Sequence, residues 1–528
     1  MIIKSSSPDV TIADVTITDY VLRHTQRLGD KPALIDGPSG RTITYGQLAD
    51  SVRRTAAGLA QRGFRKGDVF AIYSPNVPEY AVIFLAVASL GGINTTANPL
   101  YTADELGKQL KDSRARFLVT VPMFLDKAKE AAQKAGVEEV FVFGSADGAT
   151  SFAELLKAGD RPPAVKIDPK TDLVVLPYSS GTTGLPKGVM LTHRNLVANL
   201  TQCEGMQNFE GFAERDTIMA VLPFFHIYGM VVIMMFGLAG GGTIVSMPRF
   251  DLMEFLTLVQ KHRATILPLV PPIVVGMVKH PAVAQYDLSS VRLVFSGAAP
   301  LGEDMARELS RKLNCPVVQG YGMTEASPVT HLSPTKNSPM KPGSAGRVIP
   351  NTEVKIVDVG TGQEAAQGQE GELLIRGPQI MKGYLNQPEE TAACLDREGW
   401  YHTGDVGYVD GDGYFFIVDR TKELIKYKGL QVAPAELEAL LVTHPAVLDV
   451  AVVRKSDEEA GEVPKAFVVL KPDDASKATA AETIMDWVAE RVAPHKRVRH
   501  LEFIEQIPKS ASGKILRRVL MDMDKAKA

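Results

Sequence analysis

The sequence predicts an α/β fold made of at least two domains. Up to about residue 344, apolar strand-like runs alternate with helix-like runs, which is typical of parallel sheets covered by helices. Two glycine-rich stretches in this region follow such strands, at the edge where open parallel sheets bind ligands. A chain of 528 residues, 45% of them hydrophobic, is also too long for one hydrophobic core.

We expect the first third of the chain to be scaffold, because it contains no convincing catalytic cluster. Tyr45–Phe64 has its apolar residues on one helical face, and Glu79–Leu90 is a second predicted helix. Short apolar runs predict strands at Val69–Tyr73, Leu118–Val121 and Glu139–Phe143.

The stretch from Tyr178 to Gly188 has the composition of a phosphate-binding loop. It reads YSSGTTGLPKG and lies between two apolar runs, 173–177 and 189–191, that predict strands. Its glycines allow positive φ angles, its hydroxyl and N–H groups can line an anion site, and Lys187 adds a compact positive charge. A Walker loop would instead contain GK[ST] and lead into a helix. We therefore interpret the stretch as a phosphate loop between two strands. A flexible Ser/Thr/Gly linker is disfavoured because strands flank it.

The alternation continues beyond this loop. We expect a helix at His193–Leu200, a strand at Val291–Phe295 and a helix at Leu301–Leu313. A further strand, 316–318, runs into the second glycine turn, QGYGMTE, at 319–325. Both glycine turns therefore lie at carboxyl ends of strands.

One uncharged run, Ile227–Met247, is long enough to span a bilayer. Three glycines, 240–242, interrupt this run, and no basic cluster flanks it. We expect a buried helix followed by a buried strand, and no transmembrane segment.

After residue 344, the sequence no longer alternates between strand-like and helix-like runs. Short strands are expected at Val354–Val357, Glu372–Arg376 and Tyr414–Val418 without helices between them, and DGDG at 410–413 is a hairpin turn. We interpret this region as a small β-barrel that completes an N-terminal domain, residues 1–418.

A small α+β domain, residues 419–528, is expected to follow. Pro434 can start a helix, because proline is favoured at the first helical position. The other expected elements are strands at Val447–Val453, Ala466–Leu470 and Leu501–Ile504 and a helix at Thr483–Val492.

Composition argues against several classes of function. The net charge of −3 disfavours a surface that coats nucleic acid. The three cysteines, Cys203, Cys315 and Cys394, are scattered and odd in number, which indicates a reducing, cytoplasmic location rather than a disulfide framework or zinc site. Residues 1–8 are polar, unlike a signal peptide, and no peroxisomal Ser-Lys-Leu address ends the sequence.

Three charged residues have both a functional and an ordinary interpretation. Glu325, beyond the second glycine turn, suits magnesium as a hard oxygen ligand, or it is a glutamate favoured by a helix start. Asp405, in WYHTGD, can accept ribose hydroxyls, or it is an ordinary turn aspartate. Arg420 suits a nucleotide phosphate or ribose, or a surface salt bridge.

Two further positions are equally open when taken alone. His226 and Tyr228 lie in the apolar run LPFFHIYG. They are either buried core residues or the gate and wall of a pocket for an apolar substrate. Lys514 lies beyond a Ser-Gly turn near the end of the chain. There it can stabilise a negative transition state, or belong to a solvated basic tail.

Taken together, six stretches resemble the adenylate-forming acyl-CoA synthetases, the superfamily that includes 4-coumarate–CoA ligases and beetle luciferase. They occur in the family's order over most of the chain, and their residue sequences most resemble those of 4-coumarate–CoA ligase-like enzymes. The six stretches are 178–188, 320–325, 401–405, 419–422, 426–431 and 509–514.

The resemblance implies an ATP-dependent carboxylate–CoA ligase. Such enzymes join the acid to MgATP, giving an acyl-adenylate and pyrophosphate, and the thiol of coenzyme A then displaces AMP. The mixed anhydride supplies the leaving group that a carboxylate lacks. A mobile C-terminal lid is expected to swing about Asp419, bringing Lys514 in for the first step and the face with Lys426 for the second.

The resemblance also implies a role for each site residue. Lys514, His226 and Lys426 are expected to be catalytic, and Glu325 to hold Mg²⁺. ATP contacts are expected from Ser179, Ser180, Gly181, Thr182, Thr183, Lys187, Gln319, Gly320, Tyr321, Gly322, Thr324, Asp405, Arg420 and Lys514. Coenzyme A contacts are expected from Lys428 and Gly429. Acyl-substrate contacts are expected from His226, Tyr228, Ser296, Gly297, Gly320, Pro328, Val329 and Gln431.

The expected acyl pocket is mostly apolar, with Met230, Val231 and Val232 beside Tyr228, and suits an aryl or alkyl body. We expect 4-coumarate-like aryl acids. Medium- or long-chain fatty acids are the alternative, because plant 4-coumarate–CoA ligases usually have a lysine where this chain has Phe295.

Three other functions remain as rivals: a luciferase-like oxygenase, an adenylation domain that loads a carrier protein, and a non-catalytic nucleotide-binding module. The expected partners are small: the carboxylic acid, ATP and coenzyme A. No nucleic acid is expected, and the protein is expected to be a monomer or homodimer.

Overall fold

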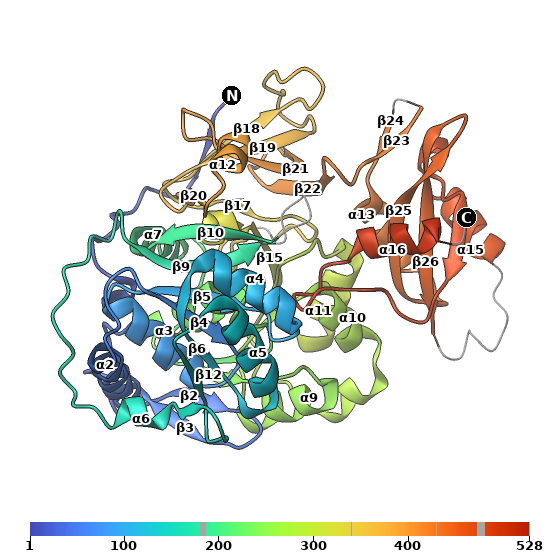
Figure 1. Cartoon of the computed structure of the whole chain (residues 1–528). Coiled ribbons are helices and arrows are strands. Elements are labelled where there is room, and N and C mark those ends of the chain that lie inside the picture. The colour runs from blue at the N-terminus through green and yellow to red at the C-terminus, as the bar shows by residue number, and fades with distance from the viewer. Residues whose placement is uncertain (180–185, 339, 429, 472–480, 527–528) are drawn as a thin grey trace.

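The structure is a computed structural model that describes residues 1–179, 186–338, 340–428, 430–471 and 481–526. The expectations for Ser180, Gly181, Thr182, Thr183 and Gly429 lie outside the described residues. Figure 1 shows two large sheets with helices packed around them, a smaller sheet above, and a C-terminal unit to one side. The predicted α/β class is confirmed.

The first large sheet carries the strands that flank the phosphate loop. Its order is β20-β10-β9-β5-β4-β6-β7-β8. The strands from β9 to β8 are parallel, whereas β10 pairs antiparallel with both β9 and β20. Its strands are β4 Val69–Tyr73, β5 Ile93–Ala97, β6 Ala115–Thr120, β7 Glu139–Val142, β8 Thr150–Ser151, β9 Leu173–Ser179, β10 Lys187–Thr192 and β20 Gly383–Tyr384. The helical segments of this region are α1 Ile17–Val21, α2 Tyr45–Gln61, α3 Glu79–Ser89, α4 Ala103–Ser113, η1 Pro122–Phe124, α5 Leu125–Ala135 and α6 Ala153–Leu156.

The second large sheet carries the strand that ends in the second glycine stretch. Its order is β17-β16-β15-β14-β13-β11-β12-β2-β3, parallel from β15 to β2 and antiparallel at both ends. Its strands are β2 Pro32–Asp36, β3 Thr42–Thr44, β11 Thr217–Ala220, β12 Thr243–Ser246, β13 Ile266–Leu269, β14 Leu293–Ser296, β15 Val317–Gly322, β16 Val329–Leu332 and β17 Arg347–Val348. The helical segments are α7 His193–Glu204, η2 Tyr228–Met235, α8 Phe236–Ala239, α9 Leu252–Lys261, α10 Pro271–Lys279, η3 Pro281–Gln285, α11 Glu303–Leu313 and η4 Thr324–Ala326.

One hydrophobic core joins the two sheets. Helix α3 is apolar on all sides, and its residues from Tyr80 to Ala88 are buried, as expected for a helix enclosed by other elements. Phe70 and Val175 from the first sheet share this core with Ile218 and Val294 from the second. The two sheets therefore share one core that supports the glycine stretches at their edges.

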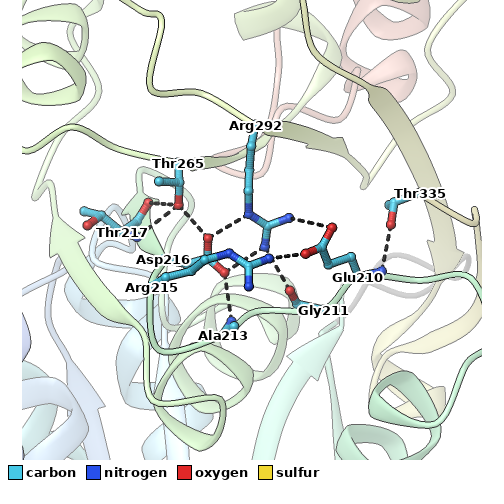
Figure 2. A network of polar contacts seen from close by, with 9 residues as sticks. All are labelled: Glu210, Gly211, Ala213, Arg215, Asp216, Thr217, Thr265, Arg292 and Thr335. Carbon is cyan, nitrogen blue, oxygen red and sulfur yellow. Dashed lines mark hydrogen bonds and ion pairs between the residues drawn. The ribbon is translucent and has the colours of Figure 1, made fainter.

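The amino ends of the second sheet's parallel strands are held by an ion pair between a buried aspartate and a partly buried arginine. Figure 2 shows Arg292, just before β14, against Asp216, just before β11, with two N–O distances of 2.7 Å. Thr265, just before β13, donates a hydrogen bond to Asp216 at 2.8 Å, and Glu210 lies beside the guanidinium. Burial alone would raise the pKa of Asp216, but the hydrogen bonds from Arg292 and from the Ala213 N–H lower it. This network lies opposite the carboxyl edge, so it supports the fold rather than the ligand site.

The smaller sheet is antiparallel and has the order β1-β18-β19-β21-β22. Strands β18, β19, β21 and β22 form the small β unit that the sequence predicts after residue 344, whereas β1, from the N-terminus, was not predicted. Its strands are β1 Ile3–Lys4, β18 Glu353–Val357, β19 Gly371–Arg376, β21 Tyr401–Val409 and β22 Phe415–Arg420.

The C-terminal unit has its own sheet and its own core. Strands β24, β23, β26 and β25 are hydrogen-bonded in that order, and β27 pairs with β26. Ile425, Leu437, Val450 and Val468 belong to a core separate from that of the large sheets. Its elements are β23 Ile425–Tyr427, β24 Leu430–Val432, α13 Pro434–Leu441, β25 Val447–Asp457, β26 Gly461–Leu470, α15 Ala481–Ala489, η5 Pro494–Lys496, β27 His500–Phe503 and α16 Arg517–Lys525. The domain boundary at Asp419 stays a prediction.

Several local expectations differ from the structure. Gln319–Gly322 is not a turn but the end of β15, because it pairs with β16. Asp405 lies within β21, at a register shift after Gly404, whose φ is 68°. Helix α12, Pro388–Cys394, interrupts the predicted β region. The run that begins at Ile227 does form a buried helix and strand, although its first part, η2, is a π-helix.

Among the described residues, no helix combines the length and the apolar character needed to cross a bilayer.

Candidate active site

Lys187 is the first residue of β10 and lies opposite Ser179, at the loop end of the β9–β10 hairpin. Its side chain is only 8% exposed and forms an ion pair with Glu390 of α12. Its ammonium also lies 5.1 Å from the centre of the Tyr384 ring, close enough for a cation–π contact. The strand pairing therefore fixes a buried positive charge beside the phosphate loop.

Glu325 lies in η4, directly after β15, and is 6% exposed. The Tyr384 hydroxyl donates a hydrogen bond to its carboxylate at 2.9 Å. Burial and the Glu325 charge raise the pKa of Tyr384, so this hydroxyl stays protonated and continues to donate. One tyrosine thus contacts both the lysine of the first glycine stretch and the carboxylate of the second.

The surroundings of Glu325 fit a magnesium ion bound together with phosphate groups. Within the described ranges, no lysine, arginine or histidine forms an ion pair with this carboxylate, and no cluster of three His, Cys, Asp or Glu side chains suits a metal. Magnesium is usually held by one or two carboxylates, with water and substrate phosphates completing its shell. A single buried carboxylate beside a phosphate loop suits that mode.

Asp405 is held from two sides at the edge of the small sheet. The Tyr321 hydroxyl donates to one carboxylate oxygen at 2.5 Å, and Arg420 Nε donates to the other at 3.2 Å. Asp405 and Arg420 are direct partners in the β21–β22 ladder. Because an ionised carboxylate has about four acceptor positions, Asp405 can still accept ribose hydroxyls.

Lys514 reaches this cluster from the C-terminal unit. It ends a tight turn in which the Ser510 N–H donates to the Lys514 carbonyl at 2.8 Å and Gly513 has a φ of 80°. A Cβ atom on Gly513 would lie 3.1 Å from Val270, at the β13–α10 junction, so this turn packs against the large sheets. Burial and Arg420 lower the pKa of Lys514, while Asp405 and Glu325 oppose that shift.

His226 lies close to the same lysine. Burial and the charge of Lys514 lower the pKa of His226 to about 3, so the imidazole is neutral at physiological pH. Its Nδ1 accepts a hydrogen bond from the Tyr228 N–H at 3.3 Å. The structure therefore brings Lys514, His226, Asp405, Arg420 and Glu325 to one site, although the sequence separates them widely.

The second glycine stretch is shaped by close packing. A Cβ atom on Gly320 would lie 2.7 Å from the Phe295 ring, and one on Gly322 would lie 2.1 Å from the Pro328 carbonyl oxygen. The Gln319 amide accepts from the Leu301 N–H at 2.8 Å and donates to the Leu301 carbonyl at 3.1 Å. Gln319 thus anchors the turn after β14.

The predicted acyl pocket has one wall on η2 and another at the end of β14. The Tyr228 hydroxyl donates to the Phe295 carbonyl at 3.0 Å, and a Cβ atom on Gly297 would lie 2.9 Å from the Tyr228 ring. The Ser296 hydroxyl is buried and has no hydrogen-bond partner in the part of the chain that the structure describes. A buried hydroxyl without a partner is a candidate ligand contact.

Lys428, expected to bind coenzyme A, lies apart from this cluster, and the expected hinge residue Asp419 borders it through Arg420. Figure 1 shows the β23–β24 hairpin, which carries Lys426 and Gln431, projecting from the C-terminal unit away from α10 and α11. Lys428, at the tip, pairs with Glu459. Asp419 is buried and accepts hydrogen bonds from the Arg420 N–H at 2.7 Å and the Ala435 N–H at 3.0 Å, so it ties β22 to α13.

Sequence reasoning missed Tyr384, Glu390 and Lys279. Tyr384 lies on a two-residue strand and Glu390 on α12, which was not predicted. Neither residue belongs to a recognisable sequence motif. Lys279 ends α10 and donates to two carbonyls of the C-terminal unit, Val442 and Val447. The one sequence signal for Lys279 is its position as a charged residue at the end of an apolar helix.

Comparison with known proteins gives a consistent result. Residues 21–385 match the family model described as AMP-binding enzyme, and residues 436–514 match the AMP-binding enzyme C-terminal domain. The chain is 47% identical over 529 residues to a 4-coumarate–CoA ligase of Oryza sativa subsp. japonica, covering 98% of this chain and 94% of that protein. It is 45% identical over 527 residues to one of Petroselinum crispum, covering 98% and 96%.

Two solved structures share the whole fold. The anthranilate CoA ligase AuaEII in complex with anthranoyl-AMP has a TM-score of 0.89 at 26% identity, covering 97% of this chain and 98% of that one. ATP-bound MatB from Rhodopseudomonas palustris has a TM-score of 0.86 at 29% identity, covering 97% and 99%.

Proposed function

The chain belongs to the AMP-binding enzyme family and is an AMP-forming acid–CoA ligase, and we propose that it acts on aryl acids of the 4-coumarate type. The observation that supports the adenylation chemistry of this proposal is the position of Lys514. A lysine of the C-terminal unit lies beside His226, Asp405, Arg420 and Glu325 of the rest of the chain. Similarity over nearly the whole chain to 4-coumarate–CoA ligases supports the acid class.

In the proposed first step, a carboxylate oxygen of the acid attacks the α-phosphorus of ATP. The bond from that phosphorus to the bridging oxygen breaks, and pyrophosphate leaves. Lys187 and the loop after Ser179 bind the β- and γ-phosphates, and Asp405 and Arg420 bind the ribose. Lys514 stabilises the charge that develops between carboxylate and α-phosphate, which is electrostatic catalysis by a positioned cation. A magnesium ion held by Glu325 would neutralise phosphate charge.

In the proposed second step, the thiol of coenzyme A attacks the acyl carbon and AMP leaves. The described pose presents Lys514 to the site and keeps Lys426 and Gln431 away from it, which is the arrangement needed for adenylation. We infer that rotation of the C-terminal unit about Asp419 exchanges these two faces between the steps, as lids do in other enzymes. Lys428 would then contact coenzyme A.

Two further assignments belong to this proposal. The three cysteines are unpaired, which supports a reducing, cytoplasmic location. The protein acts without nucleic acid, as a monomer or homodimer.

The test is acid-dependent exchange of labelled pyrophosphate into ATP, followed by coenzyme A-dependent release of AMP. We expect cinnamates to support both reactions. Exchange without coenzyme A dependence would indicate a luciferase-like oxygenase or a carrier-loading domain. Release of ADP, or no reaction with any of the cinnamates, benzoates and fatty acids of a panel, would reject the proposal.

A further inference from the structure

We propose that Asp112 of helix α4 is a positioning residue for the polyphosphate of ATP. Its carboxylate ties together the two segments on either side of Lys187, and so it sets how tightly the protein binds ATP relative to AMP. The inference rests on the proposed function, because it takes over the assignment of Lys187 to the β- and γ-phosphates. Asp112 itself lies outside all six stretches that carry the family resemblance.

Asp112 lies in the last turn of α4 and accepts a hydrogen bond from the residue that begins the first glycine stretch. The Tyr178 hydroxyl donates to Asp112 Oδ2 at 2.7 Å. Burial and this hydrogen bond both raise the pKa of Tyr178, so the hydroxyl stays protonated and continues to donate. Tyr178 is the next-to-last residue of β9, and its partner across the hairpin is Gly188. Asp112 therefore holds the hairpin one residue away from Lys187.

The same aspartate also holds the turn between β20 and α12. Asn386 Nδ2 donates to Asp112 Oδ1 at 3.1 Å and to the Asp112 backbone carbonyl at 3.3 Å. Asn386 has a φ of 55°, a left-handed conformation that asparagine adopts more readily than most residues. The turn separates Tyr384, whose ring lies against the Lys187 ammonium, from Glu390, which pairs with it. Asp112 thus also fixes the segment that supplies both neighbours of the lysine.

The two segments that Asp112 holds pack directly against each other beside Lys187. The Leu385 N–H donates to the Gly188 carbonyl at 2.8 Å. A Cβ atom on Gly188 would lie 3.1 Å from the Tyr178 ring and 3.3 Å from the Leu385 side chain. Because Lys187 directly precedes Gly188, movement of either segment shifts the ammonium relative to its two neighbours.

The contacts of the Asp112 carboxylate differ from those of a surface ion pair. In the part of the chain that the structure describes, its hydrogen-bond donors are uncharged: the Tyr178 hydroxyl and the Asn386 amide. Hydrogen bonds to an ionised acceptor are stronger than those between neutral groups, and two of them in different directions fix geometry as well as energy. Asp112 therefore serves to join three segments, α4, the β9–β10 hairpin and the β20–α12 turn.

The consequence should depend on the number of phosphates in the nucleotide. In the proposed site, Lys187 contacts the β- and γ-phosphates, which AMP lacks. The ribose is bound elsewhere, by Asp405 and Arg420. Loosening the segments around Lys187 should therefore weaken the binding of ATP and leave the binding of AMP unchanged.

The experiment measures the Kd of MgATP and of AMP by titration calorimetry of the full-length protein. Asp112→Ala removes both side-chain hydrogen bonds, so the Kd of ATP should rise about tenfold while that of AMP stays at the wild-type value. In pyrophosphate exchange, KM for ATP should rise by the same factor without a change in KM for the acid. Thioester formation from supplied acyl-adenylate, which involves no polyphosphate, should keep its rate.

Two further variants separate the links. Asp112→Asn keeps an acceptor for the Tyr178 hydroxyl and should recover most of the affinity for ATP. Asn386→Gly suits the φ of 55° and removes only the link to the β20–α12 turn, so it should raise the Kd of ATP by a smaller factor than Asp112→Ala does. Asp104→Ala is the matched control, because Asp104 lies on the same helix and forms an exposed ion pair with Lys134. Its Kd values for ATP and AMP should both equal those of the wild type.

The ratio of the two Kd values decides the outcome. A folded Asp112→Ala protein with the wild-type ratio would overturn the inference, and so would equal weakening of ATP and AMP, which is the result expected of a purely structural residue. If Asp112→Ala does not fold, Asn386→Gly decides in the same way. A wild-type protein that shows no acid-dependent exchange would defeat the proposed function as well, so the two failures are distinguishable.

Discussion

Lys279, at the end of α10, donates hydrogen bonds from Nζ to the Val447 carbonyl at 2.8 Å and to the Val442 carbonyl at 3.0 Å. These contacts join the large sheets to the C-terminal unit in the pose that presents Lys514. Hydrogen bonds from charged donors typically contribute about 1.5–3 kcal/mol. Lys279 is therefore a positioning residue for the proposed first step.

Replacement Lys279→Ala should lower the rate of pyrophosphate exchange by about tenfold, or ~1.4 kcal/mol, because the adenylation pose becomes less populated. Thioester formation from supplied acyl-adenylate should keep its rate. Lys312→Ala is the matched control, because Lys312 donates to two carbonyls of the same helix, Met277 and Val278, but does not join the two units. Equal loss of both half-reactions in Lys279→Ala would contradict this role.

Replacement Lys514→Ala should reduce pyrophosphate exchange by about 10²–10³-fold, the usual cost of removing one group that stabilises transition-state charge. The second half-reaction, started from supplied acyl-adenylate, should be largely spared. Lys509→Ala controls for the loss of a lysine from the same segment, because Lys509 forms an ion pair with Asp449 inside the C-terminal unit. If Lys514→Ala slows both half-reactions to the same extent, the lysine does not belong to the first step alone.

Replacement Tyr384→Phe tests the link between Lys187 and Glu325. The ring below Lys187 stays, but the hydrogen bond to Glu325 is lost, so the carboxylate is held less firmly. We expect the Mg²⁺ concentration for half-maximal exchange to rise about tenfold, as for other partners of metal ligands. Tyr45→Phe removes a buried hydroxyl that donates to the Gly242 carbonyl elsewhere, and it should leave this concentration unchanged. An unchanged Mg²⁺ requirement in Tyr384→Phe would separate Glu325 from metal binding.

Replacement Asp216→Asn should lower the free energy of unfolding by up to about 3–5 kcal/mol, because it removes the buried carboxylate that Arg292 contacts at 2.7 Å and leaves only the partly exposed Glu210, at 3.9 Å, as its anionic neighbour. Asp287→Asn disrupts an ion pair with Arg263 in which both side chains are more than half exposed. That change should cost less than about 1 kcal/mol. Denaturant titration of both variants measures the difference, and similar losses would show that the Asp216 network does not hold the strand ends.

Acid should destabilise the protein through its buried histidines. Burial lowers the pKa of His331 to about 3, whereas in the unfolded chain it is about 6.5. The unfolded state therefore binds an extra proton below pH 6.5, and stability falls as the pH falls from 6.5 toward 3. The slope is at most about 1.4 kcal/mol per pH unit for this residue.

The variant His331→Phe removes this titration and should show a shallower loss of unfolding free energy between pH 6.5 and 4.5. His495→Phe is the control, because it removes a histidine that lies in η5 and is not buried, and it should keep the wild-type slope. Parallel slopes for wild type and His331→Phe would show that His331 is already charged when folded.

Much of the fold was predictable because its signals are local. The predicted strand Val69–Tyr73 has the same bounds as β4, and the helix predicted to begin at Tyr45 corresponds to α2. The Pro434 helix start was also found in α13. Each depends on periodicity or on a residue that restricts the backbone locally.

The remainder depends on tertiary contacts. Gln319–Gly322 has glycines that suit a turn, yet pairing with β16 draws it into a strand. Tyr384 and Lys279 act through partners far away in sequence, and no spacing marks such pairs. The roles of Lys514 and His226 at one site were predicted only from the family resemblance, because more than half of the chain separates the two residues.

The ion pair between Lys187 and Glu390 has a consequence for the nucleotide cycle. A carboxylate from α12 already pairs with this lysine. In the proposed site, the ATP phosphates would have to displace that carboxylate, which would weaken nucleotide binding. When pyrophosphate leaves, Glu390 would pair with Lys187 again, so the proposed site would favour product release over tight retention of either polyphosphate.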